Sequence, residues 1–198
     1  MSQPPIAAHD LTLGLIAGGR ARRLGGLEKA WLERGGQPQV LRLAATFADA
    51  AGDVLVSANR ELARLEAAGL RAVADRVEGT GPLAALDALA AACRSDWLFT
   101  LPVDLVDAPD DLLATLVAGR STHGARLCDD DGAQPLVALW RTDMLRETVA
   151  AALAAREYAV HALQARLGLA EVRLRGMRLG NLNTPDDLHA AGFQVPNP

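Results

Sequence analysis

The chain has 198 residues, of which 50% are hydrophobic but only 4% aromatic, so we expect one domain with a core of Ala, Leu and Val. A formal net charge of −4 argues against a general surface for nucleic acid or anionic membranes. No apolar run is long enough to span a bilayer, and the N-terminus lacks the basic and apolar regions of a signal peptide, so we expect a cytoplasmic location.

The first predicted element is a buried strand over Leu11–Ile16, after a lead-in over residues 1–10 that we expect to be disordered. The strand breaks at Gly18 and Gly19, and a cationic, glycine-rich loop continues to Lys29. Glycines let backbone N–H groups approach phosphate oxygens, and fixed cations neutralise their charge. The loop has neither P-loop nor GxGxxG spacing, which leaves another kind of polyphosphate site or a solvated Arg/Gly turn. Its position directly after the first strand favours the polyphosphate site.

Strands and helices alternate after this loop, which is typical of a parallel sheet covered by helices. The patterns predict helices over 40–51, up to 68 and over 82–93, and strands over 53–58, 70–74 and 96–101. Later elements are an antiparallel pair, 126–128 with 135–140, a helix over 144–155, a strand at 172–174 and a helix that begins at Thr184. A polar turn at 129–134 connects the antiparallel pair, and we expect its residues 129–132 to form a solvated hairpin turn. The elements predict a single α/β domain over residues 11–198.

Asp104 follows the strand predicted at 96–101, at the end of the strand where such sheets bind ligands. A carboxylate there can hold Mg²⁺ together with phosphate oxygens. The alternative for Asp104 is a helix cap or a turn. Asn181 and Asn183 flank the predicted helix start, and a turn or cap role would also explain them.

The loop IAGGRARRLGGLEK resembles the signature of the molybdenum cofactor guanylyltransferases (MobA), commonly LAGG-x-[SA]-x-RMGG-x-DK. Other segments follow in the order of that family: VSANR, ADRVEGTGPLAAL, the acid of WLFTLPVD, DGAQPLVAL and NLNTPDDL. The resemblance implies a three-layer α/β/α fold with a mostly parallel sheet, the Rossmann-like nucleotidyltransferase domain of the glycosyltransferase-A type. It also implies transfer of GMP from GTP to the terminal phosphate of molybdopterin, with Mg²⁺ as cofactor and release of pyrophosphate.

The resemblance implies that Arg23, Lys29 and Asp104 are catalytic, with the two cations on the triphosphate and Asp104 on Mg²⁺. Asn183 would contact the metal or molybdopterin. This chemistry needs no nucleophilic Ser or Cys, because the attacking group is already a phosphate anion. Cations, Mg²⁺ and positioning offset the repulsion between the anions.

Gly18 and Gly19 would lie against the guanine and the phosphates. AGG in the loop favours GTP, since the related cytidylyltransferases usually carry AAG. The other nucleotide-binding positions that the resemblance implies are Ala17, Arg20, Asn59, Asp75, Gly81, Pro82 and Leu83.

The chain departs from the family pattern at Glu28, where the family has Asp, and at Pro109, where the proline after the strand acid is delayed. Residues 131–164, where molybdopterin contacts are expected, match least. One alternative is therefore cytidylyl transfer, or another acceptor such as a sugar phosphate. Another is a catalytically weak protein that binds nucleotide or molybdopterin as a chaperone. The expected partners are GTP, molybdopterin and a molybdoenzyme or other cofactor-biosynthesis proteins, without nucleic acid or membrane.

Overall fold

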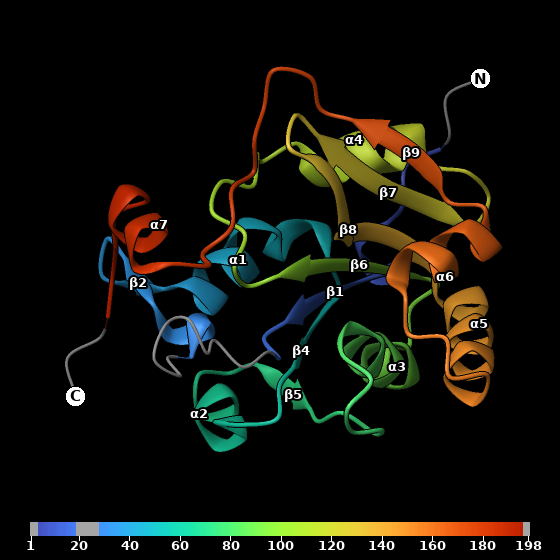
Figure 1. Ribbon diagram of the computed structural model, residues 1–198, viewed down its shortest axis with the longest axis horizontal. Helices are drawn as coiled ribbons and strands as arrows, with labels where there is room; N and C mark the ends of the chain where they lie inside the picture. The colour runs from blue at the N-terminus through green and yellow to red at the C-terminus, as the bar shows by residue number, and fades with distance from the viewer. Residues whose placement is uncertain (1–3, 19–27, 196–198) are drawn as a thin grey trace.

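A seven-stranded sheet forms the centre of the computed structural model, which describes residues 4–18 and 28–195 (Figure 1). The strand order is β5-β4-β1-β6-β8-β7-β9. β5, β4, β1 and β6 are parallel, β8 is antiparallel to both β6 and β7, and β9 is parallel to β7. The predictions of a mostly parallel sheet and of an antiparallel pair, β7 with β8, are confirmed, and the antiparallel pairing of β8 with β6 is additional. The strands span Leu11–Ile16 (β1), Asp53–Ser57 (β4), Arg71–Val73 (β5), Trp97–Pro102 (β6), Gly124–Asp129 (β7), Gly132–Arg141 (β8) and Ala170–Arg173 (β9).

Helices cover both faces of the sheet and complete the three predicted layers (Figure 1). One face carries α1 (Gln39–Thr46) and α4 (Leu112–Gly119), and the other carries α3 (Pro82–Ala92), α5 (Thr142–Ala154) and α6 (Val160–Leu167). The short helix α2 (Leu62–Ala67) packs beside β5. Because side chains alternate along a strand, Phe99 of β6 belongs to the first buried cluster and Leu98 to the second. Within the described ranges, no helix has the length and apolar character needed to cross a membrane.

The first helix is shorter than the sequence predicts. α1 ends at Thr46 instead of residue 51, and a separate 3₁₀ turn covers Ala48–Ala50. The chain turns between them at Phe47, whose buried ring packs edge-on against Phe99 with ring centroids 5.3 Å apart. The end of α1 therefore coincides with the residue whose aromatic ring is buried against β6.

The lead-in is more ordered than the sequence predicts over the residues that the structure describes. Residues 8–10 form a 3₁₀ helix. The N–H of Gly52 donates to the carbonyl of Ala8 at 2.6 Å, and Arg120 donates to the carbonyl of Pro4 at 2.8 Å. A Cβ at residue 52 would lie 2.9 Å from the same Ala8 carbonyl oxygen, so the close approach requires glycine.

A second, three-stranded sheet joins segments that are distant in the sequence. It consists of β2 (Glu33–Arg34), β3 (Gln37–Pro38) and β10 (Phe193–Gln194), with α7 (Pro185–Ala190) beside it. A small buried cluster holds this region together: Leu32, Val106, Leu182, Leu188 and Phe193. The cluster brings the chain around Lys29, the loop after β6 and the segment before α7 to one place.

Gly14 in the middle of β1 lets α3 pack closely on the sheet. A Cβ at this position would lie 3.0 Å from Leu98 Cδ1 and 3.1 Å from Leu89 Cδ1. Leu89 belongs to α3, and both leucines are fully buried. Any side chain at residue 14 must therefore displace core methyl groups.

We expect Gly14→Val to lower the free energy of unfolding by about 1–3 kcal/mol, because it overfills the contact between β1 and α3. Urea denaturation of the wild type and the variant measures this difference. Gly14→Ala adds a single methyl group against mobile leucine ends and should cost less. A valine variant as stable as the wild type would contradict the close packing.

Candidate active site

The carboxyl ends of β4, β1 and β6 meet at one edge of the sheet, because these strands are parallel neighbours. Ala17 and Gly18 follow β1, Asn59 lies just after β4, and Asp104 lies just after β6. Open α/β sheets bind their ligands at this edge. Candidate residues from three separate segments are thereby brought to the same place.

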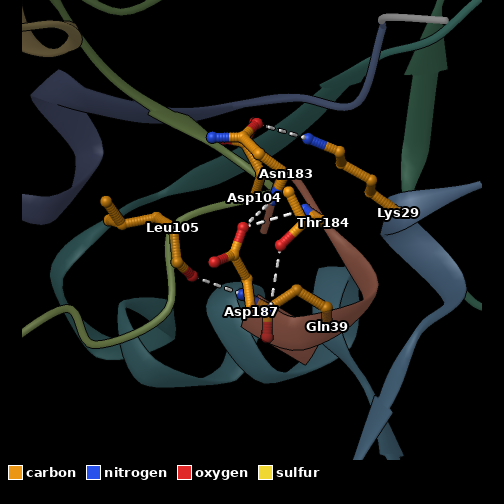
Figure 2. A network of polar contacts seen from close by, with 7 residues as sticks. All are labelled: Lys29, Gln39, Asp104, Leu105, Asn183, Thr184 and Asp187. Carbon is orange, nitrogen blue, oxygen red and sulfur yellow. Dashed lines mark hydrogen bonds and ion pairs between the residues drawn. The ribbon is translucent and has the colours of Figure 1, made fainter. Parts of the chain in front are cut away.

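Lys29 is in direct contact with both Asp104 and Asn183 (Figure 2). Lys29 Nζ lies 3.0 Å from Asp104 Oδ2 and donates to Asn183 Oδ1 at 3.3 Å. The side chains of Lys29 and Asp104 are 18% and 28% exposed, so this ion pair is less screened by water than a surface pair. A carboxylate oxygen and an amide oxygen therefore converge on one cation.

The loop after β6 is held by backbone pairing with the segment before α7. The N–H of Leu182 donates to the carbonyl of Asp104 at 2.9 Å, and the N–H of Asp107 donates to the carbonyl of Leu179 at 3.0 Å. These bonds join residues more than seventy positions apart, since the second segment returns to the sheet edge. The backbone positions of Asp104 and Asn183 consequently depend on each other.

Side chains of α1 fasten the other side of the same loop. Gln39 is fully buried and donates through Nε2 to the carbonyl of Leu105 at 2.6 Å (Figure 2). Arg42 donates to Gln39 Oε1 and to the carbonyl of Val106, both at 2.9 Å. Burial lowers the pKa of Arg42, and the neighbouring charge of Arg34 lowers it further. The first turn of α1 thus anchors the loop that carries Asp104.

The predicted start of α7 at Thr184 is confirmed and forms a capping box (Figure 2). Thr184 Oγ1 accepts from the N–H of Asp187 at 3.2 Å, while Asp187 Oδ2 accepts from the N–H groups of Asn183 at 3.0 Å and Thr184 at 2.8 Å. These hydrogen bonds, led by the one from Asn183, lower the pKa of Asp187. The cap fixes the backbone at Asn183 and directs its side chain to Lys29.

Two cavities open on this edge of the sheet. The larger has a volume of about 930 Å³ and the smaller about 310 Å³. The described residues that line both are Ile16, Gly18 and Leu136, so the cavities meet at the end of β1. Among the predicted nucleotide-binding residues, the larger cavity is lined by Ala17, Gly18, Asn59, Asp75, Gly81 and Pro82. The smaller is lined by Asp104, Gln134, Pro135, Val137, Asn181 and Asn183, together with Pro102.

Asn59 and Asp75 form a rigid pair on the wall of the larger cavity. Asn59 Nδ2 donates to Asp75 Oδ2 at 2.7 Å, and the N–H of Asp75 donates to Asn59 Oδ1 at 3.0 Å. Arg60 and Glu28 also line this cavity and form an ion pair at 3.4 Å. The wall therefore offers hydrogen-bonding groups, and its charged residues in the described part of the chain are one cation, Arg60, and three carboxylates, Glu28, Asp75 and Glu78.

The N-terminus of α3 also borders the larger cavity. Gly81 precedes the helix with a φ of 61°, a backbone conformation that favours glycine, and Pro82 occupies the first turn. The helix N-terminus therefore adds N–H groups and a positive dipole end to this wall. Leu83 behaves differently from the prediction, because its side chain is fully buried in the core and does not line the cavity.

Several lining residues are absent from the sequence prediction. Arg60, Glu78 and Gly79 line the larger cavity, and Gln134 and Leu136 line the smaller. Arg60 could have been found as the neighbour of Asn59, whereas Gln134 lies in the 131–164 region where molybdopterin contacts are expected but has no feature that distinguishes it there. The predicted residues Gly19, Arg20 and Arg23 lie in segment 19–27, outside the described residues.

The prediction of a solvated hairpin turn at 129–132 is wrong for Asp129, which is only 7% exposed. Its carboxylate accepts from the N–H of Leu179 at 3.0 Å, from Gln134 Nε2 at 3.1 Å and from the N–H of Asp131 at 3.0 Å. Burial raises the pKa of Asp129, but these hydrogen bonds together outweigh burial and leave the pKa below its usual value. The segment that covers Asp129 comes from fifty positions away, so local sequence does not reveal its burial.

The family profile of the MobA-like NTP transferase domain matches residues 14–170. The chain belongs to the MobA-like NTP transferases. The molybdenum cofactor guanylyltransferase of Cupriavidus taiwanensis is 32% identical over 195 residues, which cover 93% of this chain and 98% of that protein. The guanylyltransferase of Cupriavidus necator is 32% identical over 193 residues, covering 92% and 96%. This MobA-like chain is therefore a nucleotidyltransferase, as the sequence predicts.

Solved structures share the fold of this MobA-like chain. Molybdopterin-guanine dinucleotide biosynthesis protein A from Archaeoglobus fulgidus superposes with a TM-score of 0.65 at 19% identity, covering 91% of this chain and 96% of that one. The 2-C-methyl-D-erythritol 4-phosphate cytidylyltransferase from Thermus thermophilus gives a TM-score of 0.66 at 20% identity, covering 90% and 96%. The predicted Rossmann-like fold of a nucleotidyltransferase is confirmed.

We expect Asp129→Asn to lower the free energy of unfolding at pH 7 by about 1–3 kcal/mol, because a charged acceptor with three donors is lost. The folded-state pKa of Asp129 is lowered, so its contribution is present above the unfolded-state pKa of about 4 and is lost as the pH falls through the folded-state value. Urea denaturation at pH 7 and at lower pH values should show that the difference in free energy of unfolding between the wild type and the variant shrinks below a pH of about 4.

The matched control is Asp131→Asn, because Asp131 lies in the same turn and its side chain pairs only with exposed Arg178 among the described residues, at 3.4 Å. Its effect should stay below about 0.5 kcal/mol. A stability difference for Asp129→Asn that is the same at all pH values would contradict the charged role of Asp129.

Proposed function

We propose that this chain is a molybdenum cofactor guanylyltransferase, which transfers GMP from GTP to the terminal phosphate of molybdopterin and releases pyrophosphate. The observation that carries the proposal is the pair of cavities that meet beside Gly18, with Asp104 and Lys29 in contact at the same strand edge. A transferase needs this arrangement, because two substrates must be held side by side. The names of the relatives from Cupriavidus support guanylyl transfer.

GTP would occupy the larger cavity. Its wall offers the Asn59–Asp75 pair for hydrogen bonds and the N-terminus of α3 for an anionic group. Ala17 and Gly18 begin the AGG sequence that favours guanine in the resembling family. Gly19, Arg20 and Arg23, in the segment that follows Gly18, would add further contacts to the base and the triphosphate.

Molybdopterin would occupy the smaller cavity. Gln134, Asn181 and Asn183 offer amide groups that can hydrogen-bond the polar edge of a pterin, and Pro135 and Leu136 offer apolar surface. Its terminal phosphate would then lie near Asp104, on the side of the larger cavity. A molybdoenzyme or another cofactor-biosynthesis protein would receive the product.

Mg²⁺ fits the oxygen groups at the junction. Asp104 Oδ2 and Asn183 Oδ1 already converge on the Lys29 ammonium, so both oxygens can face a cation. Mg²⁺ is commonly bound by one or two carboxylates together with substrate phosphates, and the described residues contain no cluster of three or more His, Cys, Asp or Glu that would suit an all-protein site. A bound Mg²⁺ would supply neutralisation of phosphate charge.

The chain's own residues would orient the substrates and balance charge. An oxygen of the acceptor phosphate forms a bond to the α-phosphorus of GTP, and the bond from that phosphorus to the β-phosphate oxygen breaks. Lys29 would turn from Asp104 to the phosphates and offset negative charge as the anions approach and pyrophosphate leaves. Arg23 would share this role. No side chain needs to deprotonate a nucleophile, because the acceptor phosphate is already ionised.

We expect Asp104→Asn to lower the kcat of guanylyl transfer by about 100-fold or more, because the carboxylate that pairs with Lys29 and would hold Mg²⁺ is lost. The measurement is pyrophosphate release with GTP, molybdopterin and Mg²⁺. Asp107→Asn is the matched control, since Asp107 is an exposed neighbour on the same loop that pairs with Arg34. Full activity in Asp104→Asn would contradict the role of this carboxylate.

A nucleotide panel tests the function as a whole. GTP, CTP, ATP and UTP are titrated with and without Mg²⁺, followed by measurement of pyrophosphate release with molybdopterin. We expect Mg²⁺-dependent turnover with preference for GTP. A preference for CTP would reject guanylyl transfer, and tight GTP binding without turnover would indicate a binding protein in place of an enzyme.

A further inference from the structure

The buried carboxylate of Asp129 connects the two walls of the smaller cavity. One wall contains Gln134 of β8, and the other contains Asn181 and Asn183 before α7. Asp129 Oδ2 accepts both from Gln134 Nε2 and from the N–H of Leu179. Neither β8 nor the 179–183 segment is a chain neighbour of the other, so this carboxylate is a direct link between them.

We propose that Asp129 is a positioning residue for the acceptor. It fixes the orientation of the Gln134 amide and holds the segment that carries Asn181 and Asn183. The inference rests on the proposed function, which assigns the acceptor to the smaller cavity. Asp129 itself does not line either cavity, so it acts through these neighbours.

The hydrogen bond to Asp129 determines which end of the Gln134 amide is available to a ligand. An ionised carboxylate only accepts hydrogen bonds, so the amide must direct Nε2 toward Asp129. The carbonyl oxygen Oε1 is then the polar atom left for a ligand in the cavity. A hydrogen-bond-accepting oxygen at this point suits a ligand edge with N–H donors, such as the amino group and ring N–H of a pterin.

The hydrogen bond to Leu179 extends the effect of Asp129 to the opposite wall. The carbonyl of Leu179 accepts a hydrogen bond from the N–H of Asp107, and the N–H of Leu179 donates to Asp129. Both backbone polar groups of Leu179 are therefore hydrogen-bonded. Two residues further on, Asn181 begins the part of the segment that lines the cavity. The larger cavity is lined mainly by residues at the ends of β1, β4 and β5 and by α3, with Leu136 as its contribution from β8, and Asp129 is not among its lining residues. Loss of the carboxylate should therefore affect the two substrates unequally.

The experiment compares the KM for molybdopterin and the KM for GTP in Asp129→Asn, Gln134→Ala, the double variant and the control Asp131→Asn. We expect Asp129→Asn to raise the KM for molybdopterin by about tenfold or more, with the KM for GTP changed less than about twofold. Asparagine presents N–H groups as well as an oxygen, so Gln134 is no longer held in one orientation. The double variant should raise the KM for molybdopterin by less than the product of the two single effects, because both changes remove the contact between Asp129 and Gln134. Asp131→Asn should match the wild type.

Equal changes in both KM values, or additive effects in the double variant, would overturn the positioning role. If Asp129→Asn does not fold, Gln134→Ala decides, since Gln134 is only half-buried: an unchanged KM for molybdopterin overturns the proposal, and a selective rise supports it. Hydrogen exchange of the Leu179 amide separates this inference from the proposed function. A wild type that neither binds nor guanylylates molybdopterin refutes the function. Even in that case, faster exchange of the Leu179 amide in Asp129→Asn than in Asp131→Asn supports the link between the two walls. Equal exchange rates in the two variants overturn it.

Discussion

Burial of β1 on both faces is the constraint on which the site depends. All six residues of this strand are buried, between β4 on one side and β6 on the other. Gly14 lets α3 approach one face, while Leu13 and Leu15 contribute to the core on the other. Since the three strands are parallel, their carboxyl ends form one edge, and the residues that follow β1 emerge between the two cavities. The ligand-binding edge is thus a direct result of packing in the core.

The site is completed by segments that come from outside the central strands. The small sheet brings the chain near Lys29 together with the region around α7, and the Asp104 loop lies between them. Gln39 anchors this loop from α1, while the segment before α7 pairs with its backbone. A polar group at the junction is therefore positioned by at least two independent elements. Such support is what accurate alignment of two phosphates requires.

The sequence allows the sheet, the helices around it and the strand-end position of Asp104 to be predicted, because these follow from apolar periodicity and local chain order. The contact of Lys29 with Asn183 spans 154 positions and has no local signal, and only the resemblance to a family suggests that the two share a site. For Asp129, a local signal is present but leads to a wrong prediction. Three consecutive acids predict a solvated turn, but a segment from fifty positions away covers the first of them and supplies a donor. Leu83 adjoins two cavity residues, yet helix geometry turns its side chain into the core.

Two cations at the junction, Lys29 and Arg60, already have carboxylate partners in the part of the chain that the structure describes. Lys29 is paired with Asp104, and Arg60 is paired with Glu28, the residue that replaces the family's aspartate. Paired charges produce little potential at a distance, and a salt solution screens what is left. A polyanion in solution would therefore feel little long-range attraction to these two cations. An anionic ligand must therefore compete at short range with the carboxylates that already pair with these two cations.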